Sequence, residues 1–152
     1  MWRLSSLVLA GALLAGGCSA NVSTAPTPTA PVRVTVTQNP TVAPGAAVFT
    51  LRVENISASV VNLTFPSSCQ VVPYFTDRAT GRDVPRGFAC ATVITQQTLS
   101  PGASFSQTYT VTAGSGSGPQ AIVLPPGDYA IYARLEDMAY KLTSEPVPFT
   151  LR

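Results

Sequence analysis

The chain has 152 residues, enough for one folded domain with a sizeable core. Charged residues make up 11% of it, and its nine Lys and Arg against seven Asp and Glu leave a near-neutral balance, so we expect no nucleic-acid partner. The chain has no histidine, which removes the usual general base near neutral pH and the commonest metal ligand. We therefore expect no enzymatic activity, no cofactor and no metal site.

Residues 1–17 have the features of an export signal. Arg3 supplies one positive charge, an apolar run follows over residues 7–15, and Gly16 and Gly17 precede Cys18. The apolar run is shorter than the roughly 20 residues that a membrane-spanning helix needs. The segment is therefore predicted to be a cleaved signal peptide.

Cys18 is the predicted attachment point of a lipid. Residues 14–18, Leu-Ala-Gly-Gly-Cys, resemble a bacterial lipobox, in which the cysteine thiol accepts a diacylglyceryl group and becomes the first residue of the mature protein. The alternative is an ordinary signal peptide that leaves Cys18 as a free thiol, which is a liability in an oxidising compartment. Because each buried methylene adds about 0.8 kcal/mol of membrane affinity, the acyl chains would anchor the protein to the membrane, outside the cytoplasm, in a bacterial cell envelope.

The anchor is expected to continue into a tether. Residues 19–31, SANVSTAPTPTAP, contain three prolines and neither a charged nor an aromatic residue. Such a composition favours an extended linker that rises by about 3.1 Å per residue where it is polyproline-like. We therefore divide the chain into a signal peptide (1–17), a lipidated Cys and tether (18–31) and a folded domain (32–152).

The domain has the alternation of apolar and polar residues that is typical of half-buried antiparallel strands. Six such runs have these apolar members: Val32, Val34 and Val36; Phe49, Leu51 and Val53; Val61, Leu63 and Phe65; Phe105, Tyr109 and Val111; Tyr129, Ile131, Ala133 and Leu135; Val147, Phe149 and Leu151. Turn-forming sequences separate them. We predict an all-β fold, an immunoglobulin-like antiparallel β-sandwich of about seven strands, with at most one helical turn over residues 135–140.

The two remaining cysteines are predicted to form a disulfide. Cys69 and Cys90 flank a segment that reads as a strand, a turn over residues 79–82 and a returning stretch. The chain has no CxxC motif that would suggest a metal or redox role. In the chain-entropy description, a bridge over a loop of this size stabilises the fold by about 3 kcal/mol.

Three other features have structural explanations. Residues 114–119, GSGSGP, lack the Lys-Ser/Thr ending of a phosphate-binding loop and read as a flexible connection. Asp77 and Asp83 could in principle hold calcium, but EF-hand spacing is missing and ion pairing with the neighbouring arginines or solvation is favoured. Tyr129, after a Pro-Gly turn, is expected to bond backbone across a corner of the sandwich, whereas Tyr132 lies on the opposite face and has no such explanation.

The order of motifs from residue 49 to residue 135 resembles the intracellular proteinase inhibitor (BsuPI) family. The stretch FTLRVENISASVVNLTFPSSCQVVPYFTDRATGRDV is similar to the family's opening strands and turn glycine. The stretch GFACATVITQQTLSPGASFSQTYTV then gives its Leu-x-Pro-Gly, and LPPGDYAIYARL resembles its closing Pro-Gly-x-Tyr strand. The resemblance implies an immunoglobulin-like sandwich and, by the family's name, inhibition of a serine protease.

Two functions follow as hypotheses. The first is a binding or structural module in the cell envelope that engages an unidentified envelope protein. The second is a serine protease inhibitor that presents a disulfide-braced loop to an enzyme cleft. The candidate partner-binding loop consists of Val84, Pro85, Arg86, Gly87 and Phe88. An ordinary connection between strands is the alternative for this loop.

Overall fold

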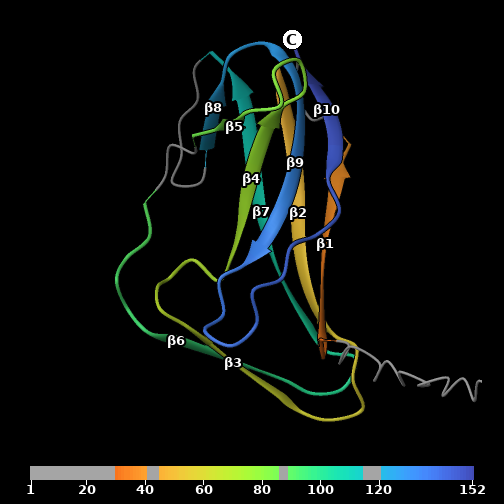
Figure 1. Ribbon diagram of the computed structural model, residues 1–152, viewed down its shortest axis with the longest axis vertical. Helices are drawn as coiled ribbons and strands as arrows, with labels where there is room; N and C mark the ends of the chain where they lie inside the picture. Colours follow the sequence, from red (N-terminus) through yellow and green to blue (C-terminus); the bar gives the residue numbers. More distant parts are fainter. Residues whose placement is uncertain (1–29, 41–44, 86–88, 115–120) are drawn as a thin grey trace, which may run out of the picture.

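The computed structural model describes residues 30–40, 45–85, 89–114 and 121–152, which form ten β-strands and no helix (Figure 1). The all-β sandwich class is thereby confirmed, with more strands than the seven expected. The strands are β1 (Val32–Asn39), β2 (Ala46–Asn55), β3 (Val61–Phe65), β4 (Val71–Asp77), β5 (Asp83–Val84), β6 (Thr95–Leu99), β7 (Ser104–Ala113), β8 (Ala121–Leu124), β9 (Gly127–Leu135) and β10 (Val147–Leu151).

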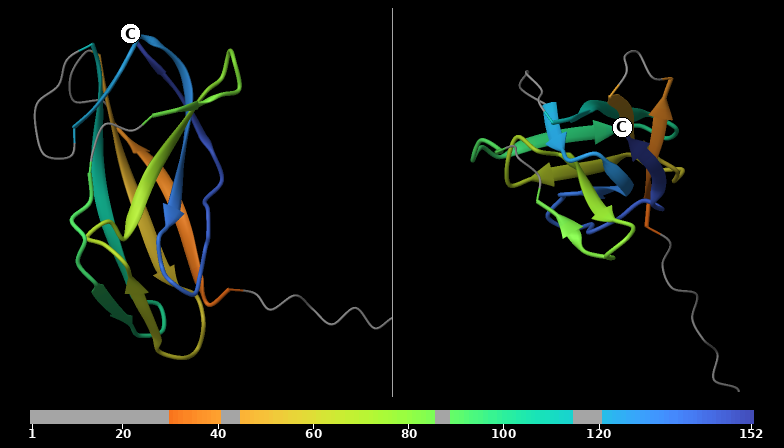
Figure 2. Two further views of the ribbon diagram at one scale, coloured as in Figure 1. Left: turned by 60° about the vertical axis from the view of Figure 1, so that its left-hand side comes forward. Right: turned by 90° about the horizontal axis from the view of Figure 1, so that it is seen from above.

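Two four-stranded sheets form the layers of the sandwich (Figure 2). Their strand orders are β1-β2-β7-β8 and β10-β9-β4-β5, and a separate pair, β3-β6, lies at the end of the molecule where β1 begins (Figure 1). All neighbours are antiparallel except β7 and β8, which run parallel. The strands β6 and β8 account for part of the excess because neither carries a long apolar alternation: β6 reads TQQTL and β8 has only four residues.

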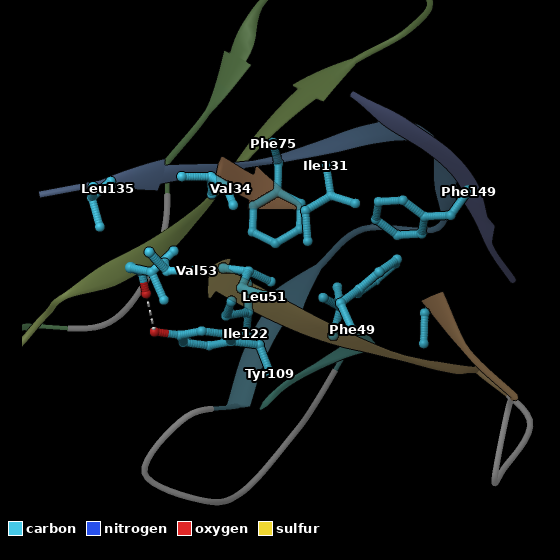
Figure 3. Close-up of a cluster of buried hydrophobic side chains, with 14 of the residues drawn as sticks. Val34, Phe49, Leu51, Val53, Phe75, Tyr109, Ile122, Ile131, Leu135 and Phe149 are labelled. Carbon is cyan, nitrogen blue, oxygen red and sulfur yellow. Dashed lines mark hydrogen bonds between the residues drawn. The ribbon is translucent and has the colours of Figure 1, made fainter. Parts of the chain in front are cut away.

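The core lies between the two large sheets. Figure 3 shows Phe49 and Leu51 of β2 pointing toward Phe75 of β4 and Phe149 of β10. The ring of Phe149 meets Phe49 edge-on, with centroids 4.8 Å apart, and lies 6.2 Å from Phe75. Such edge-to-face contacts add to the free energy gained by burying the rings. A hydrogen bond of 3.0 Å from the Tyr109 hydroxyl of β7 to the carbonyl of Val71 in β4 also joins the two sheets.

The tyrosine corner expected from the sequence is confirmed. Tyr129 is buried, and its hydroxyl donates a hydrogen bond of 2.8 Å to the backbone carbonyl of Pro125. This bond closes the turn that leads into β9. Tyr129 is therefore a structural residue.

Residues 135–140 do not form a helical turn. Leu135 ends β9, and the chain then turns around Asp137, a residue that is only 1% exposed. The Asp137 carboxylate accepts hydrogen bonds from the backbone N–H groups of Thr64, Ala139 and Tyr140. Two of these bonds satisfy N–H groups within a tight non-helical turn, and the third attaches the turn to β3. A local sequence pattern could not reveal the contact with β3, because the two segments are far apart in the chain.

Replacing the buried carboxylate should destabilise the domain strongly. Asp137→Ala leaves three backbone N–H groups without an acceptor, at an expected cost of about 3 kcal/mol in the free energy of unfolding. Asp128→Ala is the matched control, because its exposed carboxylate accepts one bond from the hydroxyl of Thr150. Urea denaturation measures both; equal losses of stability would contradict the role given to Asp137.

Candidate functional site

The hairpin that carries the predicted loop is held by a tight turn between β4 and β5. The backbone N–H of Asp77 donates to the carbonyl of Arg82, and the N–H of Gly81 donates back to Asp77. Gly81 has φ of +69°, a conformation that glycine adopts without steric cost. The Asp77 carboxylate accepts from the N–H groups of Ala79 and Thr80, so it caps the turn.

The predicted disulfide between Cys69 and Cys90 is present, with the two Cα atoms 5.5 Å apart. The two cysteines occupy positions that the β4–β5 pairing would bring opposite each other. Phe75 of β4 is paired with Val84 of β5; six positions separate Phe75 from Cys69, and six separate Val84 from Cys90. The disulfide therefore joins two residues that face each other in the same antiparallel alignment.

The same alignment persists one residue beyond the disulfide. The backbone N–H of Ser68 donates to the carbonyl of Ala91, and the N–H of Ala91 donates to the Ser68 hydroxyl. Residues 84–90 are here called the stapled segment. Val84 is paired with Phe75 of β4, and Cys90 is bonded to Cys69, which lies two residues before β4 begins.

The structure describes only part of the predicted partner-binding loop. Val84 is half-buried at the end of β5, and Pro85 is exposed. Arg86, Gly87 and Phe88 lie outside the described residues, as does Cys18. Of this loop, the fold therefore establishes the position of Val84, which is paired with Phe75 of β4.

A stacked pair of tyrosines lies on the outer face of the same sheet. Tyr74 of β4 and Tyr132 of β9 are directly opposite each other, with ring centroids 5.5 Å apart and an angle of 16° between the ring planes. Both side chains are half-buried. The pairing gives Tyr132, unexplained by the sequence, a cross-strand neighbour.

Two charged side chains extend this aromatic pair. The Arg134 guanidinium lies 4.3 Å from the centre of the Tyr74 ring, a cation–π contact. Arg134 also forms a 2.7 Å ion pair with Glu136, and Glu136 accepts a 3.1 Å hydrogen bond from the Tyr74 hydroxyl. We call Tyr74, Tyr132, Arg134 and Glu136 together the tyrosine face. It presents aromatic surface and a partly exposed guanidinium, groups that contact a partner well.

The electrostatics of the tyrosine face connect it to the hairpin. Burial raises the pKa of Tyr132 above its ordinary value, the negative charge of Asp83 raises it further, and the positive charge of Arg134 opposes both. Asp83 belongs to β5, where the stapled segment begins. Asp83, which is paired with Thr76 of β4, therefore lies near the tyrosine face.

Sequence reasoning singled out Tyr132 but missed its three companions. Tyr132, Arg134 and Glu136 follow one another at every second position, so the polar phase of this strand could have drawn attention to them. Tyr74 could not be placed beside them, because its position depends on the pairing of β4 with β9, two strands about 60 residues apart in the sequence.

Among the described residues, no group of three or more His, Cys, Asp or Glu side chains is arranged to hold a metal ion. That part of the chain also contains no helix long and apolar enough to cross a membrane.

Comparison with known proteins yields no family. No protein-family description matches the chain, and no curated relative does. Similar solved structures include β-glucosidases from Listeria innocua (TM-score 0.41, 12% identity, 80% of this chain), Erythrobacter marinus (0.36, 15%, 78%) and Trichoderma reesei, a β-D-glucoside glucohydrolase (0.37, 14%, 79%). The matched part is 16%, 16% and 18% of those chains, respectively. Likenesses this distant carry no functional argument.

Removing the disulfide should loosen the stapled segment. Replacing both Cys69 and Cys90 with Ser is expected to lower the free energy of unfolding by about 3 kcal/mol, because the unfolded chain regains the freedom of a loop that spans 21 residues. Urea denaturation measures the loss. Limited proteolysis should then cut first between residues 85 and 90, and unchanged stability with uniform cleavage would contradict the staple.

Because of Tyr132, the free energy of unfolding of the domain should decrease at alkaline pH. The pKa of Tyr132 is raised in the folded state, so the unfolded chain loses this proton first, and stability falls as the pH rises above about 10. An ultraviolet-absorbance pH titration of the wild type, compared with that of a Tyr132→Phe variant, isolates the ionisation of Tyr132. Asp83→Asn should lower the pKa of Tyr132 and Arg134→Gln should raise it; shifts in the reverse directions would contradict the assigned causes.

Proposed function

We propose that this protein is a membrane-anchored lipoprotein that acts outside the cytoplasm, and that its β-sandwich is a protein-binding or structural module of the bacterial cell envelope. The observation that carries the proposal is the sequence Leu-Ala-Gly-Gly-Cys at residues 14–18, which closes the apolar run of residues 7–15 with two glycines and a cysteine. A lipid on Cys18 and the Pro/Thr-rich tether would hold the domain close to the membrane. The disulfide agrees with an oxidising compartment.

The tyrosine face supports a binding role for the domain. Tyrosine and arginine are enriched at the energetic centres of protein interfaces because they combine a large contact area with polar groups. Here the ring stack and the Arg134–Glu136 pair hold these side chains in place on a rigid sheet. A partner would therefore meet an ordered surface, which reduces the entropy lost on binding.

Lipid attachment can be tested on the full chain in a bacterial host. Wild type should fractionate with membranes, and the mature protein should have the mass of a chain that begins at Cys18 and carries a diacylglyceryl group. Cys18→Ala removes the acceptor thiol, so this variant should leave the membrane fraction or keep its signal peptide. A wild-type chain that is soluble and unlipidated would overturn the anchor.

A second candidate function is inhibition of a serine protease in the envelope. The observation that favours it is the stapled segment, which is held at Val84 by pairing with β4 and at Cys90 by the disulfide to Cys69. A loop constrained in this way loses little entropy on entering a protease cleft. In this hypothesis Arg86 would occupy the specificity pocket of a trypsin-like enzyme.

Inhibition can be tested with oxidised protein from residue 19 onward, titrated against trypsin-like and subtilisin-like proteases. Stoichiometric inhibition of the trypsin-like enzymes is expected, and Arg86→Ala should weaken it at least about 100-fold, a loss typical of a central contact residue. Arg82→Ala is the control, because Arg82 is an exposed residue in the turn of the same hairpin. Full protease activity at all ratios would remove this function and leave the binding module.

A further inference from the structure

An apolar groove runs along the side of the sandwich where edges of the two large sheets come together. It has a volume of about 430 Å³ and lies between β1 and the segment that leads into β10. Residues 32–36 line one wall, and residues 142–145 with Val147 line the other. We call this feature the edge groove. It lies on a different surface from the tyrosine face.

The lining of the edge groove shows that it follows the edge of a strand. Successive side chains of a strand point to opposite faces of a sheet, so a hollow over one face touches every second residue. Here five consecutive residues of β1 contribute. The groove therefore exposes the backbone edge of β1 as well as the apolar side chains on its inner face.

The hydrogen bonds of β2 determine which backbone groups face the groove. The N–H of Asn55 donates to Ala103 and its carbonyl accepts from Gly102, so both groups of Asn55 point away from its β1 partner Val32. Pairs in an antiparallel ladder alternate between bonded and non-bonded. The N–H and C=O groups of Val32, and by alternation those of Val34 and Val36, therefore point toward the groove, and the described part of this sheet has no strand beyond β1.

The opposite wall is also built from a strand-like backbone. Leu142 accepts a hydrogen bond from the N–H of Leu135, and the N–H of Ser144 donates to Ala133, which attaches this wall to β9. Leu142 and Val147 turn partly buried apolar side chains toward the core. The edge groove thus combines apolar surface with regularly spaced backbone donors and acceptors, which an extended polypeptide matches.

The charged residues that line the groove indicate which charge an occupant should carry. Arg33 is already engaged, because its guanidinium bonds Glu54 at 2.8 Å. Glu145 lines the groove, is exposed, and forms no ion pair with any described residue. A basic side chain on the occupant would complement Glu145.

We propose that the edge groove binds an extended segment of a partner protein, which adds to β1 as a further strand, directs alternate apolar side chains between the sheets and places a basic side chain near Glu145. The proposal rests on the proposed role as a binding module and names the chemistry of its partner. It requires neither the lipid on Cys18 nor the tyrosine face.

The experiment uses isotope-labelled protein from residue 19 onward, since the buried core lies entirely within residues 32–151. The probe is a blocked peptide of about eight residues that alternates Val and Thr and has one central Lys. A second peptide has Glu in place of Lys. Backbone NMR shifts and amide hydrogen exchange are followed up to about 1 mM peptide, a concentration that detects even weak binding.

The expected result is a set of shifts confined to residues 32–36 and 142–147, with new exchange protection at the amides of Val34 and Val36. The Lys peptide should bind about threefold more tightly than the Glu peptide, as a partly exposed ion pair allows, and Glu145→Gln should remove this difference. Val36→Pro should abolish binding because it deletes an N–H on the free edge, where proline is tolerated. Val36→Ala, which keeps that N–H, should still bind.

Four results would overturn the proposal. Absence of shifts at about 1 mM peptide would reject peptide binding in the groove, and shifts confined to Tyr74 and Tyr132 would reject the groove while retaining the binding module. A concentration-dependent dimer that protects β1 without peptide would assign the groove to a second copy. Protection of Val34 and Val36 that disappears when the chain begins at residue 30 would assign it to the protein's own tether. Loss of membrane attachment in cells would refute only the anchor.

Discussion

The structure depends on one constraint: every long strand must place alternate side chains between the two four-stranded sheets. Phe49, Phe75 and Phe149 come from three strands and two sheets, and their edge-on contacts fix how the layers lie on each other. Because side chains alternate, burying one set determines which set faces outward. The positions of Tyr132 and Arg134 on the outer face therefore follow from the burial of Ile131, Ala133 and Leu135, with which they alternate.

The disulfide acts within this constraint. Since Cys69 and Cys90 face each other in the register set by β4 and β5, the bridge extends an alignment that the backbone has already chosen. A strand edge that is paired is protected from unwanted association, a recurrent requirement for β-sheets, and β5 pairs with β4 at Phe75 and Thr76. The β1 edge is different, because its inner neighbour is an apolar groove and its outward-pointing backbone groups have no described strand beside them.

For the proposed binding module, the structure suggests three candidate contact regions: the tyrosine face, the described ends of the stapled segment, and the edge groove on the open side of the sandwich. Asp83, one residue before the stapled segment, acts by its charge on Tyr132 of the tyrosine face. The edge groove is chemically different, because backbone groups and apolar side chains dominate it. In the proposed role as a binding module, separate surfaces would allow the domain to engage two partners at once.

The sequence by itself determined the fold class, the cysteine pairing and the corner role of Tyr129, because alternation, cysteine spacing and turn chemistry are local properties of the chain. It also supplied the argument for Cys18. It missed the buried Asp137 turn, whose acceptor role depends on the distant N–H of Thr64. Only the tertiary structure placed Tyr74 beside Tyr132 and left the edge of β1 open, because strand order arises from contacts between segments far apart in the sequence, which no local pattern encodes.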